Sequence, residues 1–167
     1  MRIAVNLSVE QFRNTHLTDQ VAGVLEETGL PPKYLELEIT ESVALHETDY
    51  IIGVLKDLKS LGVSISIDDF GSEYSSLSRL KQMPVDRIKI DKQFIQGISL
   101  SADDEAVTDI ILDLSRALNL SVIAEGVESN AQLEYLSQRK CDEVQGFYFF
   151  KPLSAEELER LLKSEEG

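Results

Sequence analysis

The carboxylate pair Asp68-Asp69 is the feature of this sequence with the clearest chemical meaning. It directly follows a β-branched run at residues 63–67, so both carboxylates leave the end of a predicted strand at a turn that Gly71 permits. Adjacent carboxylates at such a turn can offer oxygen ligands to hard divalent cations such as Mg²⁺ or Mn²⁺. Because an isolated Asp-Asp pair is more often a solvated turn, the metal hypothesis depends on what the rest of the chain places beside it.

Five other short apolar runs along the chain also end on a polar or charged residue. These residues are Asn6, Glu38, Lys89, Glu125 and Gln145. Parallel strands end at one edge of their sheet, where α/β proteins bind ligands, so we expect all six positions to share one rim. A rim rich in carboxylates with a single lysine has the composition of a divalent-metal site. The Lys89 ammonium would either hold a nucleophilic water or balance the carboxylates.

The elements that must position these residues alternate along the chain. Helix-patterned segments separate most of the six runs, beginning with an amphipathic stretch from about Val9 to Thr28. Capping boxes are predicted where Ser8, Ser129 and Ser154 are each followed three residues later by Gln or Glu. The alternation predicts an α/β fold with six parallel strand–helix units.

The length of the chain decides between two architectures with parallel strands. A closed (β/α)8 barrel needs about 250 residues, whereas this chain has 167. We therefore predict a single domain over residues 1–167 that is an incomplete TIM-type (β/α)8 barrel with about six of its eight units. A six-stranded open α/β sheet is the alternative, which the lack of a Gly-rich phosphate loop disfavours.

The charge balance limits the possible partners. The chain has 30 acidic and 16 basic residues and a formal net charge of −14, which repels DNA, RNA and anionic lipid surfaces. A small anionic ligand remains compatible if cations mediate the contact. No apolar stretch approaches the roughly 20 residues that cross a bilayer, so we expect no membrane insertion. The single cysteine, Cys141, fits a reducing compartment, and we expect a cytoplasmic location.

Six segments of the chain closely resemble the motifs of EAL domains, which are cyclic di-GMP phosphodiesterases. The segments are VNLS at residues 5–8, ELEITES at 36–42, SIDDF at 66–70, KID at 89–91, AEGVE at 124–128 and QG at 145–146. They occur in the correct order and cover essentially the whole chain. The resemblance implies a TIM-like barrel of the EAL type that uses two Mg²⁺ or Mn²⁺ ions to hydrolyse one phosphodiester bond of cyclic di-GMP, giving linear pGpG.

The resemblance also implies a role for individual residues. It implies metal ligation by Asn6, Glu38, Asp68, Asp69 and Glu125, with Asp68 bridging the ions and Asp69 serving the second one. Lys89 resembles the lysine that contacts the nucleophilic water, and Glu125 resembles a glutamate assigned to metal coordination or to general-base catalysis. The remaining implied site residues are Glu128 and Gln145, which complete the site, and Glu41, which steadies the loop after the Asp pair.

One departure from the family pattern affects the expected activity. The Glu-Ala-Leu sequence that names the family does not occur in this chain, and we expect it in a strand that precedes Met1. A glutamate metal ligand and an arginine associated with substrate phosphate are missing together with this sequence. We therefore expect weak or absent hydrolysis by this chain alone. The alternatives are a non-catalytic module that binds cyclic di-GMP or a protein partner, and an unrelated metal-dependent barrel. Two unpaired strand edges also predict a homo-oligomer or a complementing chain.

Overall fold

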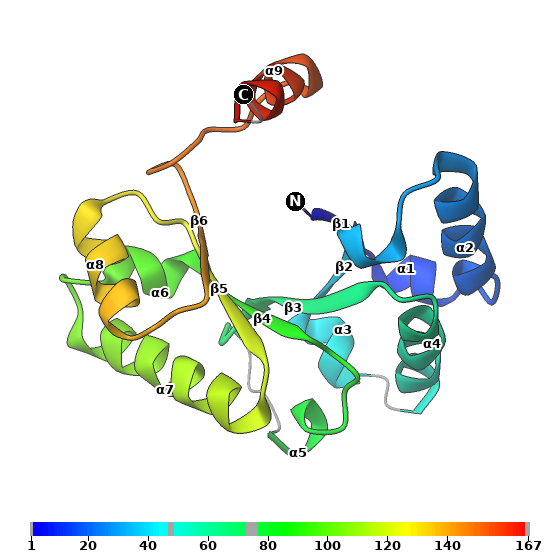
Figure 1. Ribbon diagram of the computed structural model, residues 1–167. Helices are drawn as coiled ribbons and strands as arrows, with labels where there is room; N and C mark the ends of the chain where they lie inside the picture. Colours follow the sequence, from blue (N-terminus) through cyan, green and yellow to red (C-terminus); the bar gives the residue numbers. More distant parts are fainter. Residues whose placement is uncertain (1, 47–48, 73–76, 166–167) are drawn as a thin grey trace.

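The computed structural model describes residues 2–46, 49–72 and 77–165, which contain one parallel β-sheet. Its strands are β1 (Ile3–Leu7), β2 (Leu35–Thr40), β3 (Ser64–Phe70), β4 (Arg87–Ile90), β5 (Ser121–Glu125) and β6 (Glu143–Gln145). They lie in the sheet in the same order as in the chain. A doubly wound sheet reverses its strand order at a switch point, and this sheet does not, so the alternative of an open α/β sheet of the doubly wound kind is wrong. The sheet curls into a half-barrel that is open between β1 and β6, as expected for an incomplete TIM-type barrel (Figure 1).

The helices, all but the last of them, cover the convex face of the sheet (Figure 1). They are α1 (Val9–Phe12), α2 (Leu17–Thr28), α3 (Glu41–His46), α4 (Asp49–Ser60), α5 (Leu77–Leu80), α6 (Lys92–Gly97), α7 (Ala102–Leu118), α8 (Asn130–Gln138) and α9 (Ala155–Glu165), with a 3-10 turn at Pro32–Tyr34. The predicted capping boxes at Ser8 and Ser129 are both present, and Ser154 exchanges the same pair of hydrogen bonds with Glu157. Helix α9 stands apart from the sheet. None of the helices in the described ranges combines the length and the apolar character needed to cross a bilayer.

The stretch predicted as one helix from Val9 to Thr28 forms two. Helix α1 ends at Phe12 and α2 begins at Leu17. Between them the Asn14 side chain accepts a hydrogen bond from the His16 N–H at 3.0 Å, which replaces helical bonding by a local turn.

The two faces of the sheet differ in chemistry because side chains alternate along each strand. Residues such as Ile39, Ile65 and Ile88 point toward the helices and are fully buried. The alternate positions line the inside of the half-barrel and are polar, as Glu38, Ser66 and Lys89 are, each of them buried. The apolar outer face therefore supplies the hydrophobic core, and the inner face is free to carry charge.

The carboxyl end of β6 is anchored to the segment that follows β5. The Val127 N–H donates to the Gln145 carbonyl at 3.0 Å, and the Tyr148 N–H donates to the Val127 carbonyl at 2.9 Å. This close approach needs Gly146, because a Cβ atom there would lie 2.1 Å from the Val127 carbonyl oxygen. The contact sets Gln145 beside Glu125, its register partner on β5.

Two glycine-to-alanine substitutions should therefore change stability in opposite directions. Gly146→Ala forces a backbone clash and should lower the free energy of unfolding by about 1–3 kcal/mol. Gly53→Ala in α4 adds a methyl group with no atom within 4 Å and should raise it by about 0.5–1 kcal/mol. Urea unfolding followed by circular dichroism measures both values. Equal stabilities of the two variants would show that the β5–β6 contact is not close.

Candidate metal centre

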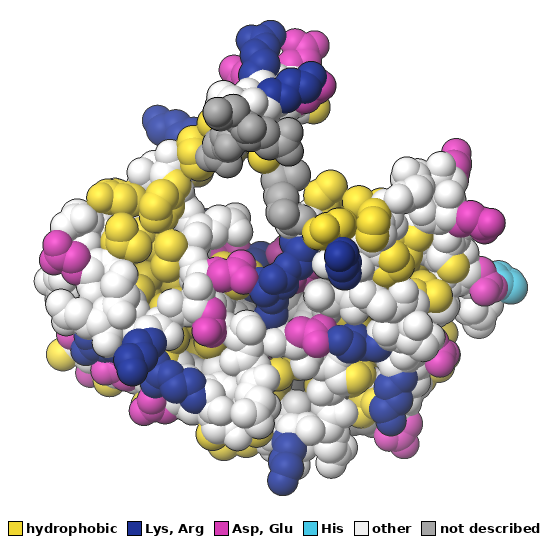
Figure 2. Space-filling view, in the orientation of Figure 1, with side chains coloured by type: hydrophobic (Ala, Val, Ile, Leu, Met, Phe, Trp, Pro, Cys, Tyr) yellow, Lys and Arg dark blue, Asp and Glu magenta, His cyan; other side chains and the backbone are white. Residues whose placement is uncertain are grey.

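A buried lysine lies at the centre of the candidate site. The Nζ atom of Lys89 on β4 is 2.8 Å from Glu38 Oε1 of β2, 3.0 Å from Asp68 Oδ1 of β3 and 2.7 Å from Glu125 Oε1 of β5. Four consecutive strands thus bring one ammonium and three carboxylates to one point on the inner face. Figure 2 shows acidic and basic side chains gathered in the hollow of the open side, with apolar areas beside it. In this structure Lys89 balances the carboxylates, one of the two roles that the sequence left open.

The Asp68-Asp69 turn brings two neighbouring carboxylates to the same side. The register of β3 with β4 shifts between Ile67 and Phe70, and Asp69 adopts a left-handed conformation with φ of +54°. Consecutive strand residues normally face opposite sides of a sheet, and the left-handed residue breaks this alternation. The turn is therefore made at Asp69 itself, followed by Gly71 at φ of +97°. Such a conformation costs a non-glycine residue on the order of 1–2 kcal/mol, and aspartate tolerates it better than most.

The turn is supported by a buried glutamate at the start of α3. Glu41, which is 2% exposed, accepts a hydrogen bond from the Gly71 N–H through Oε2 at 3.0 Å. This contact places the carboxylate under the turn rather than among the groups around Lys89. The family resemblance assigns Glu41 to steadying the loop after the Asp pair. The described part of that loop ends at Ser72, and residues 73–76 lie outside the described ranges.

Carboxylate oxygens of Asp68, Asp69 and Glu125 all lie within 4.8 Å of one another. Ligand oxygens on opposite sides of a Mg²⁺ ion are about 4.2 Å apart, since each Mg–O bond is about 2.1 Å long. Adjacent ligand oxygens of the same ion are about 3.0 Å apart, so the three carboxylates would need small side-chain adjustments to coordinate one ion. All three are the hard donors that Mg²⁺ and Mn²⁺ prefer. The donor set therefore fits a divalent cation.

The remaining predicted residues lie at the margins of this cluster. Asn6 is the register partner of Glu38 on the edge strand β1 and is exposed. Gln145 and Glu128 are also exposed, and both line a pocket of about 270 Å³ beside the cluster. The pocket is lined by Lys92, Gln96, Glu125, Gly126, Glu128, Gln145, Gly146 and Phe147. Glu125 thus belongs both to the carboxylate cluster and to the pocket.

The electrostatics of the cluster are dominated by its excess of carboxylates. Burial lowers the pKa of Lys89, but hydrogen bonds to Glu125, Glu38 and Asp68 outweigh burial and hold the pKa well above its ordinary value. Burial raises the pKa of Glu125 even though Lys89 opposes the shift. Burial and the neighbouring charge of Asp68 raise the pKa of Asp69. One ammonium does not neutralise four carboxylates, so the cluster attracts cations.

A second group of charges, which was not predicted from the sequence, lies on the same inner face. Glu36 accepts from Arg2 at 3.3 Å and lies 3.5 Å from Arg87 Nε, and Glu143 lies 2.8 Å from Arg87 Nη1. Three of these residues stand two positions before a predicted site residue: Glu36 before Glu38, Arg87 before Lys89 and Glu143 before Gln145. That spacing, which repeats the same face of a strand, is the signal that could have identified them.

Comparison with known proteins places these motifs in a family context. The EAL domain family model matches residues 1–152. The bifunctional diguanylate cyclase/cyclic di-GMP phosphodiesterase MucR of Pseudomonas aeruginosa is 46% identical over 156 residues, which are 93% of this chain and 23% of that protein. The cyclic di-GMP phosphodiesterase NbdA of the same organism is 41% identical over 98% of this chain and 21% of its own length. The chain thus spans less than a quarter of these two curated relatives.

Two solved structures share the arrangement of the strands and helices. The MucR phosphodiesterase in complex with cyclic di-GMP superposes with a TM-score of 0.90 at 45% identity, over 94% of this chain and 64% of that one. The Klebsiella pneumoniae protein BlrP1, in complex with manganese and cyclic di-GMP, gives a TM-score of 0.80 at 30% identity. That match covers 87% of this chain and 38% of BlrP1.

Removing the central ammonium should destabilise the fold in a pH-dependent manner. Lys89→Met leaves buried carboxylates without a counter-charge, so the free energy of unfolding near neutral pH, with EDTA present, should fall by about 3 kcal/mol. The carboxylates would then bind protons more readily in the folded than in the unfolded chain. The deficit should therefore shrink as the pH is lowered from about 7 to about 5.

Lys163→Met is the matched control, because it removes the same charge from an exposed i,i+4 pair with Glu159 on α9. It should change stability by less than about 0.5 kcal/mol. Urea titrations at several pH values measure both variants. If Lys89→Met lowers the free energy of unfolding no more than the control does, the central ammonium has no structural role.

Proposed function

The chain belongs to the EAL domain family, and we propose that it is a metal-dependent phosphodiesterase domain that hydrolyses cyclic di-GMP to linear pGpG. The observation that carries the proposal is the convergence of Asp68, Asp69 and Glu125, with ligand oxygens within 4.8 Å of one another, around a buried lysine. A site of this kind suits phosphoryl transfer, which depends mainly on positioning and electrostatic stabilisation.

We assign the metal ligands to Asp68, Asp69 and Glu125, with Asn6 and Glu38 contributing from the two preceding strands. When bound, two Mg²⁺ or Mn²⁺ ions would activate a water and neutralise the charge that develops on the phosphoryl group. The three carboxylates are mutually close, and we assign the bridging position to Asp68, as the family resemblance implies. The left-handed turn at Asp69 brings the Asp69 carboxylate to the same side of the sheet as the Asp68 carboxylate.

Lys89 and Glu125 are our candidates for the residues that orient the attacking water and accept its proton. The Lys89 ammonium remains charged at neutral pH because hydrogen bonds hold its pKa high, so it cannot remove a proton from a water. Its three N–H groups are directed to Glu38, Asp68 and Glu125, so it would donate to a water once one of these carboxylates turns toward a metal ion. Glu125 has a raised pKa and borders the open pocket, which suits a carboxylate that accepts a proton from the attacking water. We therefore propose that Lys89 orients the water and that Glu125 is the base.

The pocket next to Glu125 is our candidate for the site that positions the substrate. Its volume of about 270 Å³ suits part of a nucleotide, with Gln145 and Glu128 as hydrogen-bonding groups and Lys92 as the cation. The net charge of −14 does not exclude an anionic dinucleotide, since bound metal ions and Lys92 would supply the local attraction. We expect weak turnover because the Glu-Ala-Leu sequence is not part of this chain.

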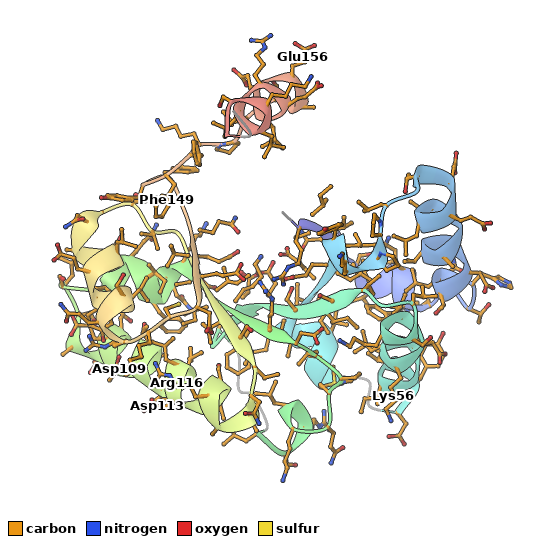
Figure 3. All side chains as sticks on the ribbon, viewed as in Figure 1. Lys56, Asp109, Asp113, Arg116, Phe149 and Glu156 are labelled. Atoms are coloured by element: carbon orange, nitrogen blue, oxygen red, sulfur yellow. The ribbon has the colours of Figure 1, made fainter. Side chains whose placement is uncertain are left out.

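The activity can be tested by incubating the protein with cyclic di-GMP and Mn²⁺ and detecting pGpG by chromatography. Asp68→Asn keeps the shape of the side chain and removes a bridging charge, so turnover should fall by at least about a hundredfold. Asp113→Asn is the matched control, because Asp113 lies on the outer surface of α7 and pairs with Arg116 (Figure 3). The control should retain the activity of the unchanged protein.

Other outcomes of the same assay distinguish the alternatives. Binding of cyclic di-GMP by the unchanged protein without any pGpG would identify a non-catalytic binding module. Absence of binding, together with cleavage of another phosphoester, would identify an unrelated metal-dependent barrel. Equal turnover by Asp68→Asn and the unchanged protein would refute the assignment of the metal site.

We also infer that the open half-barrel takes up another polypeptide, either a second copy of the chain or a complementing chain. Strands β1 and β6 each have one neighbour in the described sheet, and Ile3 and Val5 on β1 are 48% and 45% exposed. Free edges with apolar side chains recruit partners.

Light scattering during size-exclusion chromatography tests the homo-oligomer. The mass should exceed the 18.7 kDa of one chain and rise with concentration. Val5→Lys charges the edge and should shift the protein to monomer, whereas Tyr50→Lys on exposed α4 should not. A mass of one chain at every concentration would rule out the second copy as the partner.

A further inference from the structure

The inner face of the half-barrel carries two levels of charge. The upper level is the cluster around Lys89. The lower level, which we call the floor network, consists of Arg2, Glu36, Arg87 and Glu143. It lies one step toward the amino ends of the strands, because Glu36, Arg87 and Glu143 each precede an upper-level position by two residues.

Arg87 is the centre of the floor network. Its Nε atom is 3.5 Å from Glu36 Oε2 on β2, and its Nη1 atom is 2.8 Å from Glu143 Oε1 on β6. Arg87 and Glu36 are only 6% and 3% exposed. A buried guanidinium with two carboxylate partners is held in one orientation, so Arg87 connects three strands that are not neighbours in the sheet.

The network also joins the two free edges of the sheet. Arg2, next to β1, lies 3.3 Å from Glu36 and 3.7 Å from Glu143 of β6. Backbone hydrogen bonds connect each strand only to its neighbours, and in the described sheet β1 does not pair with β6. The curvature of such an open sheet is not fixed by closure. Side-chain contacts across the interior add to the intrinsic twist of the strands in opposing its flattening.

The upper-level site is sensitive to that curvature. Lys89 reaches Glu38, Asp68 and Glu125 only because β2, β3, β4 and β5 curve around one point. Flattening the sheet would separate Glu38 from Glu125, which come from strands three positions apart. The floor network and the metal cluster are therefore coupled through the shared strands.

We propose that Arg87 is a positioning residue for the metal centre: by holding Glu36 and Glu143, it sets the curvature that brings the carboxylates together. Only the metal-binding part of this inference rests on the proposed function. The effect on curvature is independent of it.

The curvature can be measured by pulsed electron resonance between two nitroxide labels. Glu26→Cys on α2 and Ser137→Cys on α8 place exposed labels on opposite sides of the half-barrel, in a Cys141→Ser background. Glu143→Gln keeps the size of the side chain and removes its charge, so the label distance should lengthen and its distribution should broaden. Arg87→Met should do this more strongly, and Arg87→Lys should restore part of the narrow distribution.

Mn²⁺ affinity gives the second readout, measured from the free-ion resonance during titration without substrate. Glu143→Gln should weaken Mn²⁺ binding by about tenfold, the low end of the effect of groups that support metal ligands. Glu134→Gln is the matched control, because it removes one carboxylate on α8 outside the interior. The control should leave both the label distance and the affinity unchanged.

The outcomes separate the two claims. An unchanged label distance in both Glu143→Gln and Arg87→Lys would overturn the claim that the floor network sets the curvature. This test does not depend on whether Arg87→Met folds. A changed distance with unchanged Mn²⁺ affinity would overturn the positioning role. If the unchanged protein binds no Mn²⁺, the proposed metal site is refuted, and the label distance alone then decides whether the floor network sets the curvature.

Discussion

The buried ammonium of Lys89 is the interaction on which the interior of this protein depends. Three carboxylates from three other strands lie within 3.0 Å of one atom. Each of them would be costly to bury alone, since an uncompensated charge in a protein interior loses its hydration without a replacement. The same excess of negative charge that makes Lys89 necessary for the fold makes the cluster attractive to divalent cations. Stability and the proposed chemistry therefore use one set of side chains.

The protein can bury these charged groups because the two faces of its sheet differ, one being apolar and the other charged. The outward residues of the strands pack against helices and form the apolar core, with Ile39, Ile65 and Ile88 fully buried. TIM-type barrels commonly fill their interior with branched apolar side chains. Here the interior holds ion pairs instead, and hydrophobic burial on the outside offsets their desolvation.

Position in the sheet decides how far each site residue is buried. Glu38 and Lys89 come from strands with neighbours on both sides and are buried, whereas Asn6 and Gln145 come from the edge strands β1 and β6 and are exposed. The central strands thus present a buried charge cluster, and the edge strands contribute groups that are exposed. This gradient explains how the chain can retain the geometry of the proposed metal centre while its half-barrel remains open.

The sequence alone determined the six strands, a polar residue at or near the carboxyl end of each of them, the capped helix starts and the incomplete barrel. All of these depend on patterns within a few residues: strand alternation, Ser with Gln or Glu at the third following position, and the count of units against length. Only the tertiary structure decided that the turn lies at Asp69, that Lys89 contacts three carboxylates at once, and that Arg2 reaches Glu143. These features join residues up to 141 positions apart in the chain. Contacts of that separation depend on the register and curvature of the sheet, and no local pattern encodes either one.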